Sequence, residues 1–240
     1  MPASETRAKF RVAFERWGLP EAIRVDNGWP WGSAGDLPTD LALWTLGLGV
    51  KMIWNPPRQP QKNGVVERSQ GTGKRWADPK TCEDIDAFRK RLAEQDAIQR
   101  EDYPSIRGLS RMAAFPGLAH SGRPYSREAE AQRWDVHHAW DHVAEYVLSR
   151  RVDCGGTISL YNRSHYIGKT LRGQDVYVSL DPLAVEWRFC DRAGVCHHHR
   201  KAEELSAERI LALSVSHHRD RPDRRRQNPP PPLQAQPGGA

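Results

Sequence analysis

Helical and extended segments alternate over the first 76 residues, and this alternation constrains the fold more than any other feature. The predicted order is helix, strand, helix, strand, helix. A strand, a helix and a second strand in succession are typical of a parallel pair joined by a crossover, so the pattern favours the α/β class. The predicted segments are residues 4–17, 22–26, 37–46, 50–54 and 63–76.

The first of these helices has an apolar stripe. Phe10, Phe14 and Trp17 recur at positions i, i+4 and i+7, which predicts one buried face. Ser4 is suited to cap the N-terminus of this helix, and Asn63 is suited to cap the last one.

The chain changes character after residue 78. A charged helix is expected over residues 84–100 and a longer helix over 126–148, capped by Ser126. From residue 149 short stretches of period two predict strands, followed by a short helix over 202–213, which is typical of a small all-β barrel. The predicted strands are residues 150–154, 157–161, 165–167, 176–180 and 185–190.

These shifts in pattern predict four units. They are an α/β unit (1–80), a helical connector (81–148), a small β-barrel (149–213) and a basic, proline-rich tail (214–240). The tail has too few apolar residues to order itself, so we expect it to be disordered.

Composition limits the location and the partners of the chain. Its 240 residues contain no apolar run near the length of a membrane span and no signal peptide, which predicts a cytoplasmic protein without a membrane partner. Lys and Arg outnumber Asp and Glu by 36 to 30, and the net charge of +6 favours an anionic partner such as nucleic acid. Four cysteines without a CxxC pair predict unpaired thiols.

Two carboxylates stand where α/β proteins place functional groups. Asp26 ends the first predicted strand, and Glu67 lies one turn into the third predicted helix. Converging carboxylates bind Mg²⁺, and a pair of such ions can activate phosphoryl transfer. Lys74 lies almost two turns after Glu67, so both side chains are expected to point the same way. The alternative is two solvated acids with no shared role.

The amino-acid sequences of the segments around Asp26 and Glu67 resemble those of a known protein family. GLPEAIRVDNG (18–28) and NPPRQPQKNGVVERSQGTGKRW (55–76) resemble the integrase core of DDE transposases of bacterial insertion sequences and of retroviral integrases. Residues 154–182, CGGTISLYNRSHYIGKTLRGQDVYVSLDP, look like the small β-barrel that follows the core in Mu-type transposases. The resemblance covers about residues 4–213 and implies a ribonuclease-H-like core.

The resemblance implies roles for particular residues. Asp26 and Glu67 match the second and third catalytic carboxylates, which in the family also hold Mg²⁺ or Mn²⁺ for DNA strand transfer. The first catalytic Asp has no counterpart, because no Asp precedes Asp26, and the opening strands of the fold are missing. We therefore expect an N-terminally truncated fragment that binds metal weakly and is inactive alone. The intact relative implies a homo-oligomer acting on double-stranded DNA, both the transposon ends and the target.

Basic residues near both resembling regions are candidate DNA contacts, although such residues often form no more than a solvated face. They are Arg58, Lys62, Arg68, Lys74, Arg151, Lys169 and Arg172. Contacts of this kind hold phosphates without reading sequence. Two other functions remain open, a non-catalytic DNA-binding remnant and an unstable pseudogene product.

Overall fold

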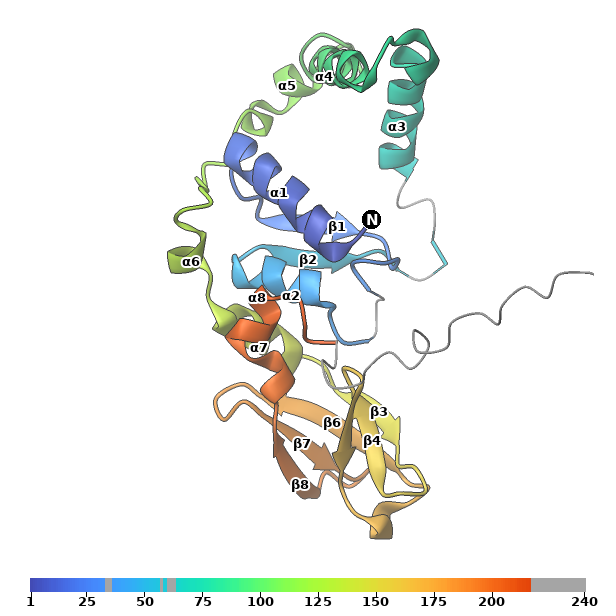
Figure 1. Ribbon diagram of the computed structural model, residues 1–240, viewed down its shortest axis with the longest axis vertical. Helices are drawn as coiled ribbons and strands as arrows, with labels where there is room; N and C mark the ends of the chain where they lie inside the picture. Colours follow the sequence, from blue (N-terminus) through green and yellow to red (C-terminus); the bar gives the residue numbers. More distant parts are fainter. Residues whose placement is uncertain (33–35, 57, 60–63, 217–240) are drawn as a thin grey trace, which may run out of the picture.

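The computed structural model describes residues 1–32, 36–56, 58–59 and 64–216, which form a mixed α/β protein (Figure 1). Figure 1 places helices α3 and α4 at one end of the molecule and strands β3, β4 and β6–β8 at the other, with β1, β2, α1 and α2 between them. The helices are α1 (Ala3–Trp17), α2 (Asp40–Gly47), α3 (Gly64–Trp76), α4 (Ile85–Glu101), α5 (Arg111–Ala114), α6 (Glu130–Arg133), α7 (Val136–Ala144) and α8 (Ala207–Leu211). The strands are β1 (Ala22–Val25), β2 (Lys51–Trp54), β3 (Leu148–Arg151), β4 (Thr157–Leu160), β5 (Arg163–Tyr166), β6 (Asp175–Asp181), β7 (Glu186–Cys190) and β8 (Cys196–Lys201).

The predicted parallel crossover is confirmed. Strands β1 and β2 pair in parallel, from Ala22 opposite Lys51 to Val25 opposite Trp54, and α2 connects them. Every residue of α2 is buried, and the Thr39 side chain accepts a hydrogen bond from the Ala42 amide at its N-terminus. A two-stranded sheet is marginal by itself, so burial of α2 supplies much of the stability of this unit.

Helix α1 matches its predicted span, but two details differ. Phe14 is buried and stacks on Trp44, whereas Trp17 is 38% exposed and lies outside the core. Trp17 is the last residue of the helix, and the Gly18 amide that follows it donates to the Phe14 carbonyl. Ser4 does not cap the helix: the N-cap residue is Pro2, which has no side-chain hydrogen bond to offer.

The expected helix over residues 126–148 is wrong. The chain forms α6, breaks at Trp134 and Asp135, and resumes as α7. The break has a tertiary cause. Trp134 adopts an extended backbone, and its indole Nε1 donates to the carbonyl of Trp44 at 3.0 Å. Asp135 then caps α7 by accepting from the His137 amide. The predicted helix over 84–100 is confirmed as α4, with Asp84 at its N-cap.

The C-terminal strands form two sheets rather than the expected closed barrel in the described part of the chain. One antiparallel sheet has the order β3-β6-β7-β8, and the hairpin β4-β5 is separate. The Val152 amide donates to the Gln174 carbonyl beside the larger sheet, and the next amide, of Asp153, donates to the Thr157 carbonyl of the hairpin. The chain therefore leaves the larger sheet after β3 and turns into the hairpin. Strand β8 was not among the predicted strands, because its sequence CHHHRK has no apolar alternation.

Part of the predicted tail is ordered. Val215 is only 1% exposed, and Ser216 donates from its amide and its hydroxyl to Asp40 Oδ1 at 3.2 and 2.9 Å. These contacts fasten the end of the C-terminal unit to the start of α2. The remainder of the predicted tail, residues 217–240, lies outside the described residues. Within the described ranges, no helix combines the length and the apolar character that a bilayer crossing requires.

Candidate functional site

The carboxyl edge of the β1-β2 sheet holds the first candidate residue. In a parallel pair both strands end at the same edge, and here the two ends are tied together. The Asn55 amide, just after β2, donates to the Val25 carbonyl at 2.9 Å, and the Asn27 side chain donates to the Asn55 carbonyl at 2.9 Å. The turn after β1 and the loop after β2 therefore leave the sheet side by side.

Asp26 is the first residue after β1 and is exposed. Its Oδ1 accepts a hydrogen bond from the Gly28 amide at 3.2 Å, which folds the Asn-Gly turn back over the strand end. The sequence prediction that this carboxylate lies at a strand end is confirmed. Its catalytic role stays a prediction.

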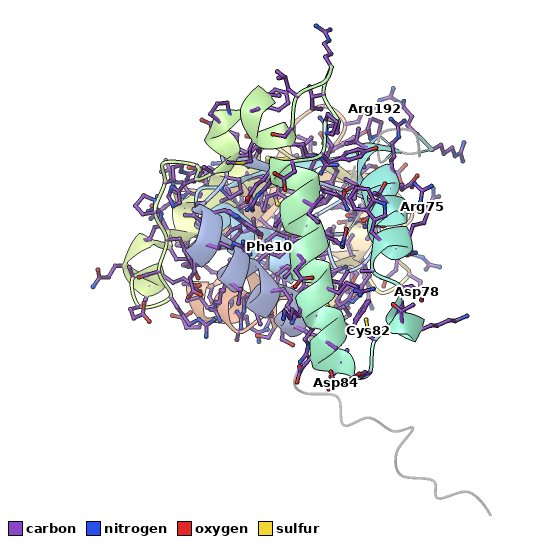
Figure 2. The ribbon with its side chains drawn as sticks, turned by 90° about the horizontal axis from the view of Figure 1, so that it is seen from above. Phe10, Arg75, Asp78, Cys82, Asp84 and Arg192 are labelled. Atoms are coloured by element: carbon purple, nitrogen blue, oxygen red, sulfur yellow. A yellow bond between two sulfur atoms is a disulfide. The ribbon has the colours of Figure 1, made fainter. Side chains whose placement is uncertain are left out.

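Glu67 lies in the first turn of α3 and is exposed, as expected from its position in the sequence. Helix α3 buries none of its residues and packs on α4 instead of on the β1-β2 sheet (Figure 1). At this contact Ser69 Oγ of α3 donates to Gln99 Oε1 of α4 at 3.3 Å. Figure 2 shows the link between these helices, running from Arg75 on α3 through Asp78 and Cys82 to Asp84 at the start of α4. The predicted cap Asn63 lies outside the described residues.

The donor set does not fit a magnesium site within the described residues. Mg²⁺ requires hard oxygen ligands from more than one converging group. Asp26 and Glu67 stand on different elements, and the structure places no group of three or more His, Cys, Asp or Glu side chains close enough to hold a metal ion in the part of the chain that it describes. We therefore assign no metal-dependent step to this pair.

Three of the predicted DNA contacts lie near one another on the C-terminal unit. Lys169 and Arg172 belong to one 3-10 turn, in which the Arg172 amide donates to the Lys169 carbonyl at 3.2 Å. Gly173 and Gln174 directly follow this turn, and both form backbone hydrogen bonds with Val152. These bonds bring Arg151, at the end of β3, beside the turn. All three basic side chains are exposed.

The predicted contacts on the N-terminal side are more spread out. Arg68 and Lys74 are exposed on α3, and Arg58 is exposed in the loop after β2. Lys62 lies outside the described residues. The N-terminal candidates therefore fall on α3 and one loop, away from the cluster of Arg151, Lys169 and Arg172.

The cysteine prediction is wrong for one pair. Cys190 on β7 and Cys196 on β8 are register partners across a turn and form a disulfide with an S–S distance of 2.04 Å. Cys82 and Cys154 are free, as expected. The signal that could have found the disulfide is the turn sequence between the two residues. Asp191 Oδ1 accepts from the Ala193 and Val195 amides, which reverses the chain.

A search against models of known protein families found no match for this chain.

Proposed function

We propose that this chain belongs to a DDE-type system for DNA transposition or integration and acts on double-stranded DNA. In this proposal residues 1–80 are part of a ribonuclease-H-like catalytic core, and residues 149–213 hold the DNA. The resembling segments 18–28 and 55–76 supply the assignment. The geometry that supports it best is the shared sheet edge, where Asp26 follows β1 and the loop toward Glu67 follows β2.

Asp26 and Glu67 are the catalytic carboxylates in this proposal. Both are exposed, so both can approach a phosphodiester without unfolding the chain. Two carboxylates on separate elements fall short of the three that the resemblance implies. We therefore propose that the chain alone binds DNA and does not turn it over, and that strand transfer requires a further carboxylate, such as one from another copy in a homo-oligomer.

Binding is assigned to the basic cluster Arg151, Lys169 and Arg172. Exposed cations that contact phosphates release counterions, so affinity falls with salt by a slope of about 0.9 per contact on duplex DNA. Three contacts make a slope of about 2.7. The cluster has no base-reading geometry of its own, so it is expected to bind duplexes of different sequence equally.

The test is fluorescence anisotropy with a labelled duplex at several salt concentrations. Substituting the three cluster residues by Gln is expected to lower the salt slope by about 2.7. The matched control removes three exposed cations elsewhere, Lys51, Lys80 and Lys90, and is expected to change the slope far less. An equal loss in both variants would refute the cluster assignment.

A nicking and strand-transfer assay with Mg²⁺ or Mn²⁺ separates the alternatives. Asp26→Asn and Glu67→Gln are expected to leave duplex binding unchanged, and the unmodified chain is expected to show no turnover. Turnover that these two substitutions abolish would make the chain a complete catalyst. If the purified chain neither binds duplex DNA nor melts cooperatively, the result would favour the alternative of an unstable pseudogene product.

A further inference from the structure

A groove of about 940 Å³ lies between α1, α4 and the segment that follows α4. Its lining combines cations with apolar side chains, and Asp96 is the one carboxylate among the lining residues. The cations are Lys9, Arg16, Arg89, Arg100 and Arg111. Asp26 and Glu67 do not line this groove, so its properties are independent of theirs.

The cations converge because of helical periodicity. Lys9, Val12 and Arg16 recur at spacings of three and four on α1, on the side of the helix away from the buried Phe14. On α4, Arg89 and Arg100 face the groove with Leu92 between them. Two exposed helix faces of like charge therefore meet across one hollow.

Most of this charge is not neutralised within the protein. Lys9, Arg16 and Arg111 make no ion pair with any residue that the structure describes. Arg89 pairs with Asp86, but both side chains are largely exposed, so this pair contributes little. Arg100 pairs with Glu101 at 2.5 Å, so its charge is partly neutralised and the three unpaired cations carry the argument. An anion entering the groove would gain several cationic partners at once.

An aromatic side chain lies among these cations. Trp17 lines the groove and is 38% exposed, and the guanidinium groups of Arg16 and Arg100 lie 4.9 and 5.9 Å from its ring centroid. Indole and guanidinium planes both stack on nucleobases. Trp17, unlike Phe14, therefore presents its indole among cations at the surface instead of packing into the core.

We propose that this groove binds a segment of single-stranded nucleic acid, with the phosphates on the cations and a base stacked against Trp17. A single strand exposes its bases to a side chain on a groove wall, whereas a duplex keeps its base faces stacked inside. An acidic peptide would satisfy the charge but would leave the indole without a stacking partner.

The groove continues toward a residue already singled out from the sequence. Ser69, Leu92 and Asp96 line both this groove and a second hollow between α3 and α4, and Lys74 lines the second one. A strand held in the groove therefore has a path along α3, the helix that carries Glu67. The inference goes beyond the proposed function, since it needs neither carboxylate nor the C-terminal basic cluster.

The test uses the full chain and a fluorescein-labelled oligo-dT of about 15 nucleotides, a length that exceeds the smaller single-strand sites. Arg16→Gln with Arg89→Gln is expected to weaken binding about 20-fold at 0.1 M salt and to lower the salt slope by about 1.4. The matched control, Lys51→Gln with Lys90→Gln, removes the same charge from exposed positions outside the groove. It is expected to retain affinity within about threefold.

The stacking contact has its own pair of variants. Trp17→Leu keeps an apolar side chain but loses the aromatic plane, and is expected to weaken oligo-dT binding about five- to 160-fold with little change in the salt slope. Trp17→Phe is expected to restore most of the loss.

The proposal is overturned if the groove variant matches the control variant, or if polyglutamate displaces the oligonucleotide as well as unlabelled oligo-dT does. It is also overturned if duplex binds the groove more tightly than the single strand. Failure of the proposed function is visible separately, because substitutions in the cluster Arg151, Lys169 and Arg172 change duplex binding and leave oligo-dT binding in place.

Discussion

Replacing Glu130 is expected to loosen the attachment of the connector to the α/β unit. Glu130 is 6% exposed and lies between α1 and α2. Its carboxylate accepts from Arg11 Nε at 2.8 Å, from Arg11 Nη2 at 2.6 Å and from Trp44 Nε1 at 3.2 Å. The Tyr125 hydroxyl donates to it as well. The substitution Glu130→Gln keeps the size but removes the charge and turns one acceptor into a donor.

The loss of stability follows from the type of contact. Breaking a buried ion pair by removing one partner costs about 3–5 kcal/mol. The Arg11 side chain is 25% exposed, so water replaces part of what it loses, and the estimate falls to about 2–3 kcal/mol. For a chain of this size the melting temperature then drops by about 4–12 °C.

The pH dependence of stability is a second, independent measure of the Glu130 contacts. Burial by itself would raise the pKa of Glu130, but the hydrogen bonds from Arg11, Tyr125 and Trp44 outweigh it and lower that pKa below its ordinary 4.5. The stabilisation is therefore fully present above pH 4.5 and is lost as the pH falls through the lowered pKa. The stability difference between the native chain and Glu130→Gln is expected to shrink in acid.

Thermal and urea melts of Glu130→Gln, followed by circular dichroism, measure both effects. The matched control is Glu128→Gln, which removes the same charge two residues away at an exposed position and is expected to change stability by less than about 0.5 kcal/mol. If Glu130→Gln and Glu128→Gln have the same melting temperature at neutral pH, the Glu130 carboxylate does not hold the connector and the reasoning is refuted.

Three further predictions concern the same fold. Reduction of the Cys190–Cys196 disulfide is expected to lower stability by about 2 kcal/mol, the entropy of closing a seven-residue loop. Melts with and without dithiothreitol measure this loss, and a Cys190→Ala/Cys196→Ala variant should show no response to the reductant. Burial lowers the pKa of His142 below its ordinary 6.5. The stability that the neutral imidazole contributes is therefore fully present above pH 6.5 and is lost as the pH falls through the lowered pKa. His142→Phe is expected to make the melting temperature less dependent on pH between pH 5 and 7. Gly47→Ala would place its Cβ 2.1 Å from Trp134 Nε1, so a loss of about 1–3 kcal/mol is expected in urea melts, and a neutral result would mean that Trp134 moves freely.

The sequence was sufficient for the parallel pair because local signals and tertiary packing agree there. Apolar residues at helical spacing and short β-branched stretches both point to the same crossover, and in the structure Thr39 also caps α2. The C-terminal strands were found for the same reason, apart from β8. That strand is held by pairing with β7 rather than by its own apolar pattern.

Tertiary contacts decided the parts that sequence reasoning missed. The break between α6 and α7 depends on an indole of the connector reaching Trp44 in α2, ninety residues away in the chain. Trp17 lies beside two arginines, one of which comes from α4. Periodicity in one segment contains no information about a partner segment of this kind, so the sequence indicated neither contact.

Shifted pKa values do not locate the functional site of this chain. Strongly perturbed groups often mark catalytic centres, and the buried carboxylates Glu130 and Glu204 would be chosen on that basis. Glu204 is fully buried, yet Trp187 Nε1 donates to it at 2.6 Å and Arg163 and His165 lie within 3.5 Å. Burial by itself would raise the pKa of Glu204, but the hydrogen bonds from His165 and Trp187 lower it. Both carboxylates are thus occupied by structural partners, so their shifted pKa values report packing contacts within the fold.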